Sequence, residues 1–162
     1  MAGENRMNNR ADEGVRRELQ AAYARAGQAW REKDAAALMQ MVTPDFTQRM
    51  PDGQVIPYDV AEAGLKEWLD TADRVTEYAV KIGELTVKGN EAVAAVEENV
   101  SMTFADPTGR PHERVMANTS QVTWIRLGDG WQIKQTEYLA ARIMIDGKLV
   151  SLATRPTPRA TG

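Results

Sequence analysis

Thr43-Pro44-Asp45-Phe46, followed by Pro51-Asp52-Gly53, and Leu127-Gly128-Asp129-Gly130-Trp131 further along the chain indicate the order of helices and strands. Pro44 is expected to end a helical segment, because proline lacks the amide hydrogen and disfavours helix in the residue before it. Pro51-Asp52-Gly53 has the composition of a turn between two short extended pieces. Gly128-Asp129-Gly130 predicts a turn between two strands. Helices therefore come first and strands later, which is typical of an α+β domain.

Three helices are expected before residue 74. The first, over 12–33, carries apolar residues at three- and four-residue spacing, which predicts one buried face. These residues are Val15, Leu19, Tyr23, Ala26 and Trp30. Asp34 is expected to cap a second, short helix. Asp59, with Glu62 three residues later, fits the capping-box start of a third helix.

From residue 74 onward the apolar period changes to two, which predicts strands. Turn-forming residues separate four long strands, at 75–88, 91–105, 111–127 and 131–145. Gly83 predicts a bulge in the first of them. Asp146-Gly147 predicts a final tight hairpin. The helices are expected to pack on one face of this antiparallel sheet.

The composition excludes several classes of protein. With 162 residues, 43% of them hydrophobic, the chain has the size and apolar content of one globular domain. We expect that domain over 13–150, with flexible tails over 1–12 and 151–162. A net charge of −3 argues against general nucleic-acid binding, and no apolar run is long enough to cross a membrane. The chain as it stands is expected to be cytoplasmic, or secreted or periplasmic if a signal peptide was removed.

The order and spacing of these turn and proline signals resemble the nuclear-transport-factor-2-like (NTF2-like) superfamily. Among its members the chain looks most similar to bacterial SnoaL-like proteins of unassigned activity. The resemblance implies an α+β fold in which three N-terminal helices pack on a strongly curved, mostly antiparallel sheet. It implies a cone with one pocket, and it is compatible with both catalytic and non-catalytic roles.

Three activities known in that superfamily lack their residues here. Aligned on Lys33-Asp34 and Gly130-Trp131, the ketosteroid isomerase positions hold Ala26, Met50 and about Val122. Limonene epoxide hydrolase needs an Arg-x-Asp on a strand, and Arg114-Val115-Met116 lacks the aspartate. Scytalone dehydratase needs paired histidines, and the chain has one histidine, His112, which we expect at the surface. One histidine without cysteine predicts no metal site, and no motif indicates a cofactor.

Polar residues interrupt the apolar faces of three predicted strands. If Phe104 pairs near His112, Glu98 lies opposite Asn118, and if Trp124 pairs with Ile133, Ser120 lies opposite Glu137. The sequence therefore predicts a polar cluster that faces the helices: Glu98, Asn118, Ser120 and Glu137. Burial would raise the pKa of such carboxyls, so that one could act as acid and the other as base.

Other residues could complete a binding site around this cluster. Tyr23, Trp68 and Tyr78 could form aromatic walls, with Tyr138 at the mouth of the cone. The competing interpretation is structural: mid-strand polar residues often hydrogen-bond across a sheet, and aromatic residues at helical spacing usually pack in a core.

Three functional hypotheses stay open. The first is acid–base catalysis without a cofactor on a small apolar or amphipathic molecule, by an isomerase, dehydratase or hydrolase. The second is a non-catalytic ligand-binding module that uses the same pocket. The third is an interaction module that forms a homodimer through the open sheet face, where Thr119, Gln121 and Thr123 would lie.

Overall fold

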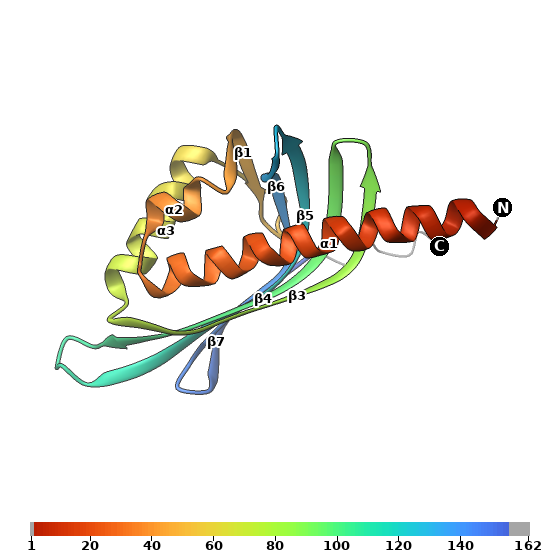
Figure 1. Cartoon of the computed structure of the whole chain (residues 1–162). Helices are drawn as coiled ribbons and strands as arrows, with labels where there is room; N and C mark the ends of the chain where they lie inside the picture. The colour runs from red at the N-terminus through yellow and green to blue at the C-terminus, as the bar shows by residue number, and fades with distance from the viewer. Residues whose placement is uncertain (1, 156–162) are drawn as a thin grey trace, which may run out of the picture.

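The computed structural model describes the backbone of residues 2–155 and the side chains from Asp12 onward. Three helices lie on one face of the sheet: α1 (Ala2–Arg31), α2 (Ala35–Met39) and α3 (Tyr58–Thr71) (Figure 1). α1 begins at Ala2 rather than near Asp12, so the predicted N-terminal tail is helical from Ala2. Adding residues to an existing helix costs far less than nucleating one, which permits this polar extension.

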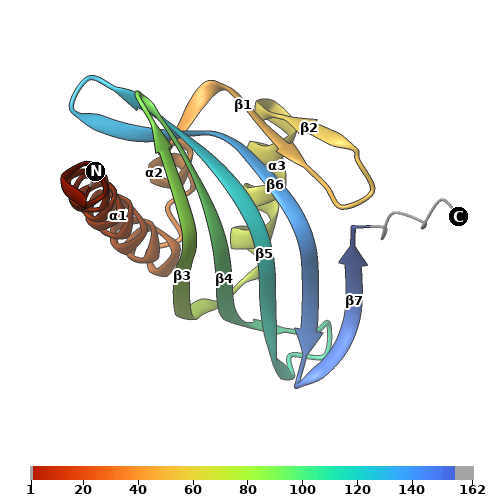
Figure 2. The same ribbon diagram turned by 90° about the vertical axis from the view of Figure 1, so that its right-hand side faces the viewer.

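The sheet contains seven strands: β1 (Val42–Arg49), β2 (Val55–Pro57), β3 (Arg74–Lys88), β4 (Glu91–Ala105), β5 (Pro111–Leu127), β6 (Gly130–Ile145) and β7 (Lys148–Thr154). Their order is β2-β1-β6-β5-β4-β3, with β7 paired to β6 (Figure 2). All neighbours are antiparallel except β1 and β6, which are parallel. This architecture confirms the predicted α+β class with a curved, mostly antiparallel sheet.

The four long strands follow the predicted ranges closely because glycine-containing turns separate them. Positive φ angles occur at Gly89, Gly109, Gly128 and Gly147, where glycine adopts the left-handed region without a Cβ penalty. The register shift between Ile82 and Leu85 contains the bulge predicted at Gly83. β7 extends to Thr154, so the predicted C-terminal tail is wrong over 151–154, and 156–162 lie outside the described residues.

The prediction that Pro44 ends a helix is wrong. α2 ends at Met39, and Pro44 lies inside β1. The chain is drawn into the sheet there by a backbone hydrogen bond of 2.8 Å from Ile133 N to Met41 O. The register of β1 against β6 is irregular between Val42 and Thr47, and such an interruption tolerates proline because no ladder amide is required.

The helix starts give one confirmed and one wrong prediction. Asp34 caps α2, since its carboxylate accepts a hydrogen bond of 3.0 Å from the backbone N–H of Ala37. α3 does not begin with the predicted capping box. Its N-cap is Pro57, which makes no side-chain cap bond, and Asp59 lies in the first helical turn. An acidic group at that position still favours the positive end of the helix dipole.

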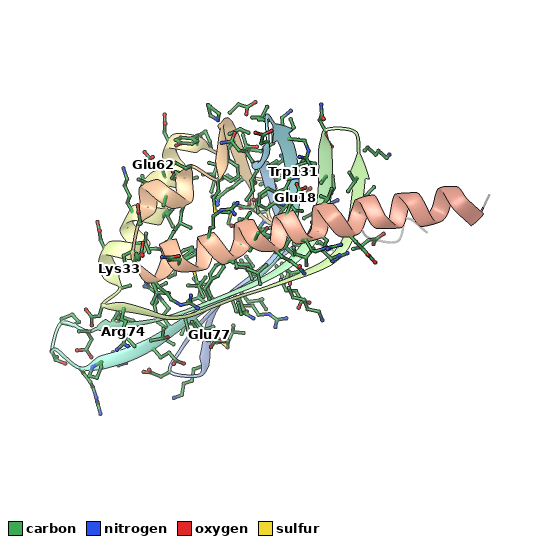
Figure 3. All side chains as sticks on the ribbon, in the orientation of Figure 1. Glu18, Lys33, Glu62, Arg74, Glu77 and Trp131 are labelled. Atoms are coloured by element: carbon green, nitrogen blue, oxygen red, sulfur yellow. The ribbon has the colours of Figure 1, made fainter. Side chains whose placement is uncertain are left out.

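Long-range polar contacts tie the helices to the rest of the fold. Figure 3 shows Lys33 after α1 and Glu18 on α1 beside Trp131 of β6. Lys33 Nζ donates a hydrogen bond of 2.6 Å to the Ala72 carbonyl oxygen beyond α3. Trp131 Nε1 donates one of 2.5 Å to Glu18 Oε2. These contacts join the middle of α1 to β6 and a residue just after its C-terminal end to the segment that follows α3.

The core lies between the helices and the covered sheet face. One cluster packs Leu19 of α1 against Trp124 and the inward residues of β4 and β5. A second cluster packs Trp30 of α1 and Leu69 of α3 against Val100 and Met102 of β4. The space between these clusters is where a cavity remains. In the described residues, no helix is long and apolar enough to cross a membrane.

Candidate functional site

A cavity of about 150 Å³ lies between the helices and the covered sheet face. Residues from α1, α2, α3, β1, β4, β5 and β6 line it, so distant parts of the chain meet there. Its polar lining comes from Tyr23, Gln48, Glu98, Ser120, Thr136 and Tyr138. Trp30, Leu38, Phe46, Leu65, Val96 and Val122 are among its apolar lining residues. A cavity of this volume can hold a molecule about the size of benzene.

Glu98 is the acidic residue that lines this cavity. It lies on β4 between Val96 and Val100, both of which are buried. Burial raises the pKa of Glu98 above its ordinary value, because removal from water disfavours the charged carboxylate. A hydrogen bond of 2.7 Å from the Tyr78 hydroxyl to Glu98 Oε2 opposes that rise without cancelling it.

Two further tyrosines border the cavity beside this carboxyl. Tyr23 comes from α1 and Tyr138 from β6. Burial is the largest cause of the raised pKa of each phenol, and the charge of Glu98 adds to it. Gln48 Nε2 donates a hydrogen bond of 3.3 Å to the Tyr138 hydroxyl oxygen. Both phenols therefore stay protonated and can serve as hydrogen-bond donors toward a bound molecule.

Tyr78 lines a larger outer groove, and its hydroxyl bonds Glu98 of the inner cavity. The groove, of about 510 Å³, runs between α1 and β3 and is lined by both Tyr23 and Tyr78. A Cβ atom at Gly27 would lie 3.0 Å from the Tyr78 ring. Glycine at this position of α1 thus lets the ring pack closely against the helix while its hydroxyl reaches Glu98.

The structure contradicts the predicted placement of Glu137. Trp124 pairs with Ile133 as predicted, but Thr123 pairs with Gln135, which leaves Lys134 as an extra residue in β6. Beyond such a bulge, each side chain lies on the opposite face of the sheet from the one that simple alternation predicts. Ser120 consequently pairs with Tyr138 instead of Glu137.

Glu137 instead pairs with Gln121, on the face away from the helices. Its carboxylate makes an ion pair of 3.0 Å with Arg155 Nη2, and it does not line the cavity. The two predicted carboxylates therefore do not converge. Among the described residues that line this cavity, Glu98 is the one carboxyl available for acid–base chemistry.

The remaining predicted residues divide between the cavity and its surroundings. Ser120 is buried and lines the cavity. Asn118 pairs with Glu98 as predicted, so both lie on the covered face, but Asn118 is not part of the cavity lining. Trp68 lies at a different cavity, where the Arg114 guanidinium stacks on its ring. The predicted aromatic wall at Trp68 is therefore misplaced: Ala61 and Leu65 of α3 line the Glu98 cavity, whereas Trp68, further along the same helix, lines the other one.

Sequence reasoning missed Gln48 and Thr136. Gln48 reaches Tyr138 because β1 pairs in parallel with β6, a long-range contact without a local sequence signal. Thr136 enters the cavity because of the bulge at Lys134. The bond from Tyr78 to Glu98 was more accessible to prediction: Val100 pairs with Tyr78, so Glu98 is its diagonal neighbour on the same face.

No group of three or more His, Asp or Glu side chains that could hold a metal ion occurs within the part of the chain that the structure describes.

The predicted surface residue His112 is partly exposed and bridges two turns. Its Nε2 lies 2.8 Å from Asp106 Oδ2, and its Nδ1 lies 2.6 Å from Asp146 Oδ2. The contacts raise the pKa of His112, first through the hydrogen bond to Asp146. This cluster lies apart from the Glu98 cavity.

Several solved structures share the fold. A conserved protein from Planctomyces limnophilus is 17% identical with a TM-score of 0.66, and the alignment covers 82% of this chain and 98% of that one. A proposed dehydratase of the NTF2-like family from Streptomyces avermitilis is 13% identical with a TM-score of 0.61, over 78% and 96%. A proposed scytalone dehydratase from Novosphingobium aromaticivorans is 16% identical with a TM-score of 0.60, over 99% of both chains. At such identities the similarity shows the fold alone.

Sequence comparison identifies the family. No curated protein matches this chain. The family model for the SnoaL-like domain matches residues 20–136. That range contains Tyr23, Tyr78, Glu98 and Ser120, and ends at Thr136, two residues before Tyr138. The match covers most of the chain and agrees with the helix order and the curved sheet, so this protein belongs to the SnoaL-like domain family of the NTF2-like superfamily.

Proposed function

We propose that this protein binds a small, mostly apolar molecule in the Glu98 cavity and transfers protons to and from it. The observation that carries the proposal is the Glu98 carboxyl, which lines a cavity of mixed polar and apolar residues beside three tyrosines and has a pKa raised by desolvation. A group whose pKa moves toward neutral pH is suited to general acid–base catalysis. Isomerisation and dehydration are the reaction classes that this arrangement favours, without a cofactor.

One carboxyl is sufficient for a dehydration. Protonated Glu98 would donate its proton to a departing hydroxyl group, the carbon–oxygen bond would break, and water would leave. The resulting carboxylate would take a proton from the adjacent carbon, the new double bond would form, and Glu98 would return to its protonated state. Two of the structural neighbours are named as proposed dehydratases, which is compatible with this class.

The cavity residues have distinct parts in the proposed reaction. Tyr138, held by Gln48, and Tyr23 would donate hydrogen bonds to a substrate oxygen. Ser120 could accept or donate a further one. The Tyr78 hydroxyl already bonds Glu98, so Tyr78 acts on the carboxyl and not directly on the substrate.

The experiment is a screen of β-hydroxy ketones of about six to eight non-hydrogen atoms, with product formation followed by mass spectrometry. For a substrate that reacts, Glu98→Gln should lower kcat by about 10²–10⁴-fold. Glu137→Gln is the matched control, because Glu137 lies outside the cavity, and it should retain activity. Equal losses in both variants, or full activity in Glu98→Gln, would contradict the proposal.

A non-catalytic binding module is the second candidate. It is favoured by the absence of a second carboxyl in the cavity lining of the described residues and by the bond that already occupies Glu98 Oε2. In that case a screened compound would raise the melting temperature of the protein and be recovered unchanged. Glu98→Gln would then alter affinity without a reaction to abolish.

We also propose a homodimer through the sheet face that the helices leave open (Figure 1). Thr119 and Gln121 lie exposed on that face, as a partly polar interface would require. Sedimentation velocity at increasing concentration should show a dimer, and Gln121→Arg should weaken it by placing a larger, charged side chain in the interface. A monomer at all concentrations would remove this proposal.

A further inference from the structure

Arg114 occupies the covered face of β5 at the end of the sheet near α3. It lines a cavity of about 310 Å³ together with Gly64, Glu67, Trp68 and Thr71. None of these residues lines the Glu98 cavity. The two cavities therefore have no lining residue in common, although the same helix, α3, contributes residues to both.

Contacts fix the guanidinium group in position. Its central carbon lies 3.8 Å from the centre of the Trp68 ring and 5.4 Å from that of Phe104. Arg114 Nη2 donates a hydrogen bond of 3.1 Å to Thr71 Oγ1 and contacts Met102 Sδ at 2.9 Å. A planar cation stacked on aromatic rings has little freedom to rotate, so its donors point in set directions.

Within the part of the chain that the structure describes, no carboxylate forms an ion pair with Arg114. Arg114 Nε is buried and has no hydrogen-bond partner among those residues. Burial also lowers the pKa of Arg114, which reflects the cost of removing an unpaired charge from water. Charges removed from water are normally paired, so the buried part of this guanidinium favours a bound anion beside it.

We propose that the cavity beside Arg114 is a second binding site, separate from the Glu98 cavity, for a small molecule that carries a carboxylate. Its carboxylate would accept hydrogen bonds from the guanidinium, and its body would pack against Trp68. Arginine suits this ligand because its planar fork matches the two oxygens of a carboxylate. At about 310 Å³ the cavity exceeds the volume that accommodates a benzene ring, so an aromatic acid fits in size.

Glu67 carries a charge opposite to that of Arg114 in the same cavity, so its substitution should have the opposite effect on binding. It is the acidic residue in the lining of this cavity, it is exposed, and it makes no ion pair with Arg114 within the described chain. Its negative charge would repel a bound carboxylate. Removing that charge should therefore strengthen binding, whereas removing the charge of Arg114 should weaken it.

The experiment is calorimetric titration of the full chain with benzoate, and with benzyl alcohol as the neutral analogue of similar shape. Benzoate should bind at least about tenfold more tightly than benzyl alcohol, because the charge-assisted bonds need the carboxylate. Arg114→Gln should reduce benzoate affinity at least about tenfold. Glu67→Gln should increase it by about two- to fivefold, as expected for one exposed charge.

Arg126→Gln is the matched control. Arg126 also stacks on a tryptophan, 4.6 Å from the centre of the Trp131 ring, but it is paired with Glu18 at 2.9 Å. Benzoate affinity should be unchanged in that variant. The place where benzoate binds is tested independently by the shift of the Trp68 indole N–H resonance when benzoate is added.

Three results would overturn the site: no benzoate binding to either the parent chain or Glu67→Gln, equal affinity in Arg114→Gln, or no movement of the Trp68 resonance. If Arg114→Gln does not fold, the increased benzoate affinity of Glu67→Gln and the shift of the Trp68 resonance still test the site. Because the reaction proposed for Glu98 has its own variants, either proposal can fail alone.

Discussion

The Tyr78 hydroxyl donates a hydrogen bond of 2.7 Å to Glu98 Oε2, across two neighbouring strands. The bond joins a residue of the outer groove to the carboxyl of the inner cavity. It favours the charged carboxylate, whereas burial favours the neutral acid, and burial is the larger influence. The protonation state of Glu98 is thus set by two opposing effects that mutation can separate.

Tyr78→Phe should raise the pKa of Glu98 further. The substitution keeps the ring and removes the donor that stabilises the carboxylate. The measurement is a carbon-13 NMR titration of the Glu98 carboxyl. Tyr138→Phe is the control, since its hydroxyl bonds Gln48 and makes no hydrogen bond to Glu98. An unchanged or lower pKa of Glu98 in Tyr78→Phe would contradict the assigned role of this bond.

Alanine should be better tolerated at one helical glycine than at another. Gly64→Ala in α3 meets no atom within 4 Å, so it should raise the free energy of unfolding by about 0.5–1 kcal/mol. Gly27→Ala in α1 places its Cβ 3.0 Å from the Tyr78 ring, which must move. Its free energy of unfolding should fall below that of Gly64→Ala in urea denaturation. Equal gains would show that the Tyr78 ring adjusts freely.

The contacts of His112 should stabilise the fold below neutral pH. Its raised pKa means that the folded state holds the proton more tightly than the unfolded chain. This stabilisation is fully present below the unfolded value of about 6.5 and is lost as the pH rises through the higher folded value. Asp106 and Asp146 have lowered pKa values, so their contribution is lost only as the medium becomes strongly acidic.

Melting temperatures of His112→Asn and the parent chain test this window. The variant should melt lower than the parent at about pH 5.5 and approach it at about pH 9, where the imidazole is neutral. Gln132→Asn, at an exposed polar contact remote from both turns, serves as the control and should show a constant difference. A difference for His112→Asn that grows with pH would contradict the direction of its shift.

Leu19 should be a principal contributor to stability. It is 0% exposed and lies in the cluster that holds α1 against β4 and β5. Leu19→Ala should lower the free energy of unfolding by about 2–5 kcal/mol. Leu149→Ala, at a residue that is 54% exposed, should change it by less than about 0.5 kcal/mol. Urea denaturation of the two variants checks the difference, and similar losses would mean that α1 is not packed as described.

The local signals of the sequence were sufficient for most of the sheet. Turn residues bound the long strands, and counting outward from the β4–β5 turn correctly pairs Glu98 with Asn118. The same counting fails on β6. The extra residue Lys134 shifts the register by one, so Glu137 lies on the opposite face of the sheet from the one predicted. A bulge of this kind depends on how the sheet curls, and nothing in the residues around Lys134 marks it.

Tertiary contacts decided the other departures. β1 contains Pro44 because the chain there pairs with β6, far away in the sequence, and such parallel pairing overrides a local helix-ending signal. That pairing also brings Gln48 to Tyr138, a contact that no local pattern encodes. Single residues of the candidate site, such as Glu98 and Tyr138, were recognisable, whereas the partners that position them required the fold.

The pKa of Glu98 is the quantity that tests the account most directly. A carbon-13 NMR titration of the glutamate carboxyls in the full chain measures it, and comparison with Glu98→Gln assigns the resonance. We expect its midpoint clearly above the ordinary glutamate value of about 4.3, because the partly buried carboxyl is desolvated where it lines the cavity. A midpoint at or below that value would contradict the proposed proton transfer by Glu98.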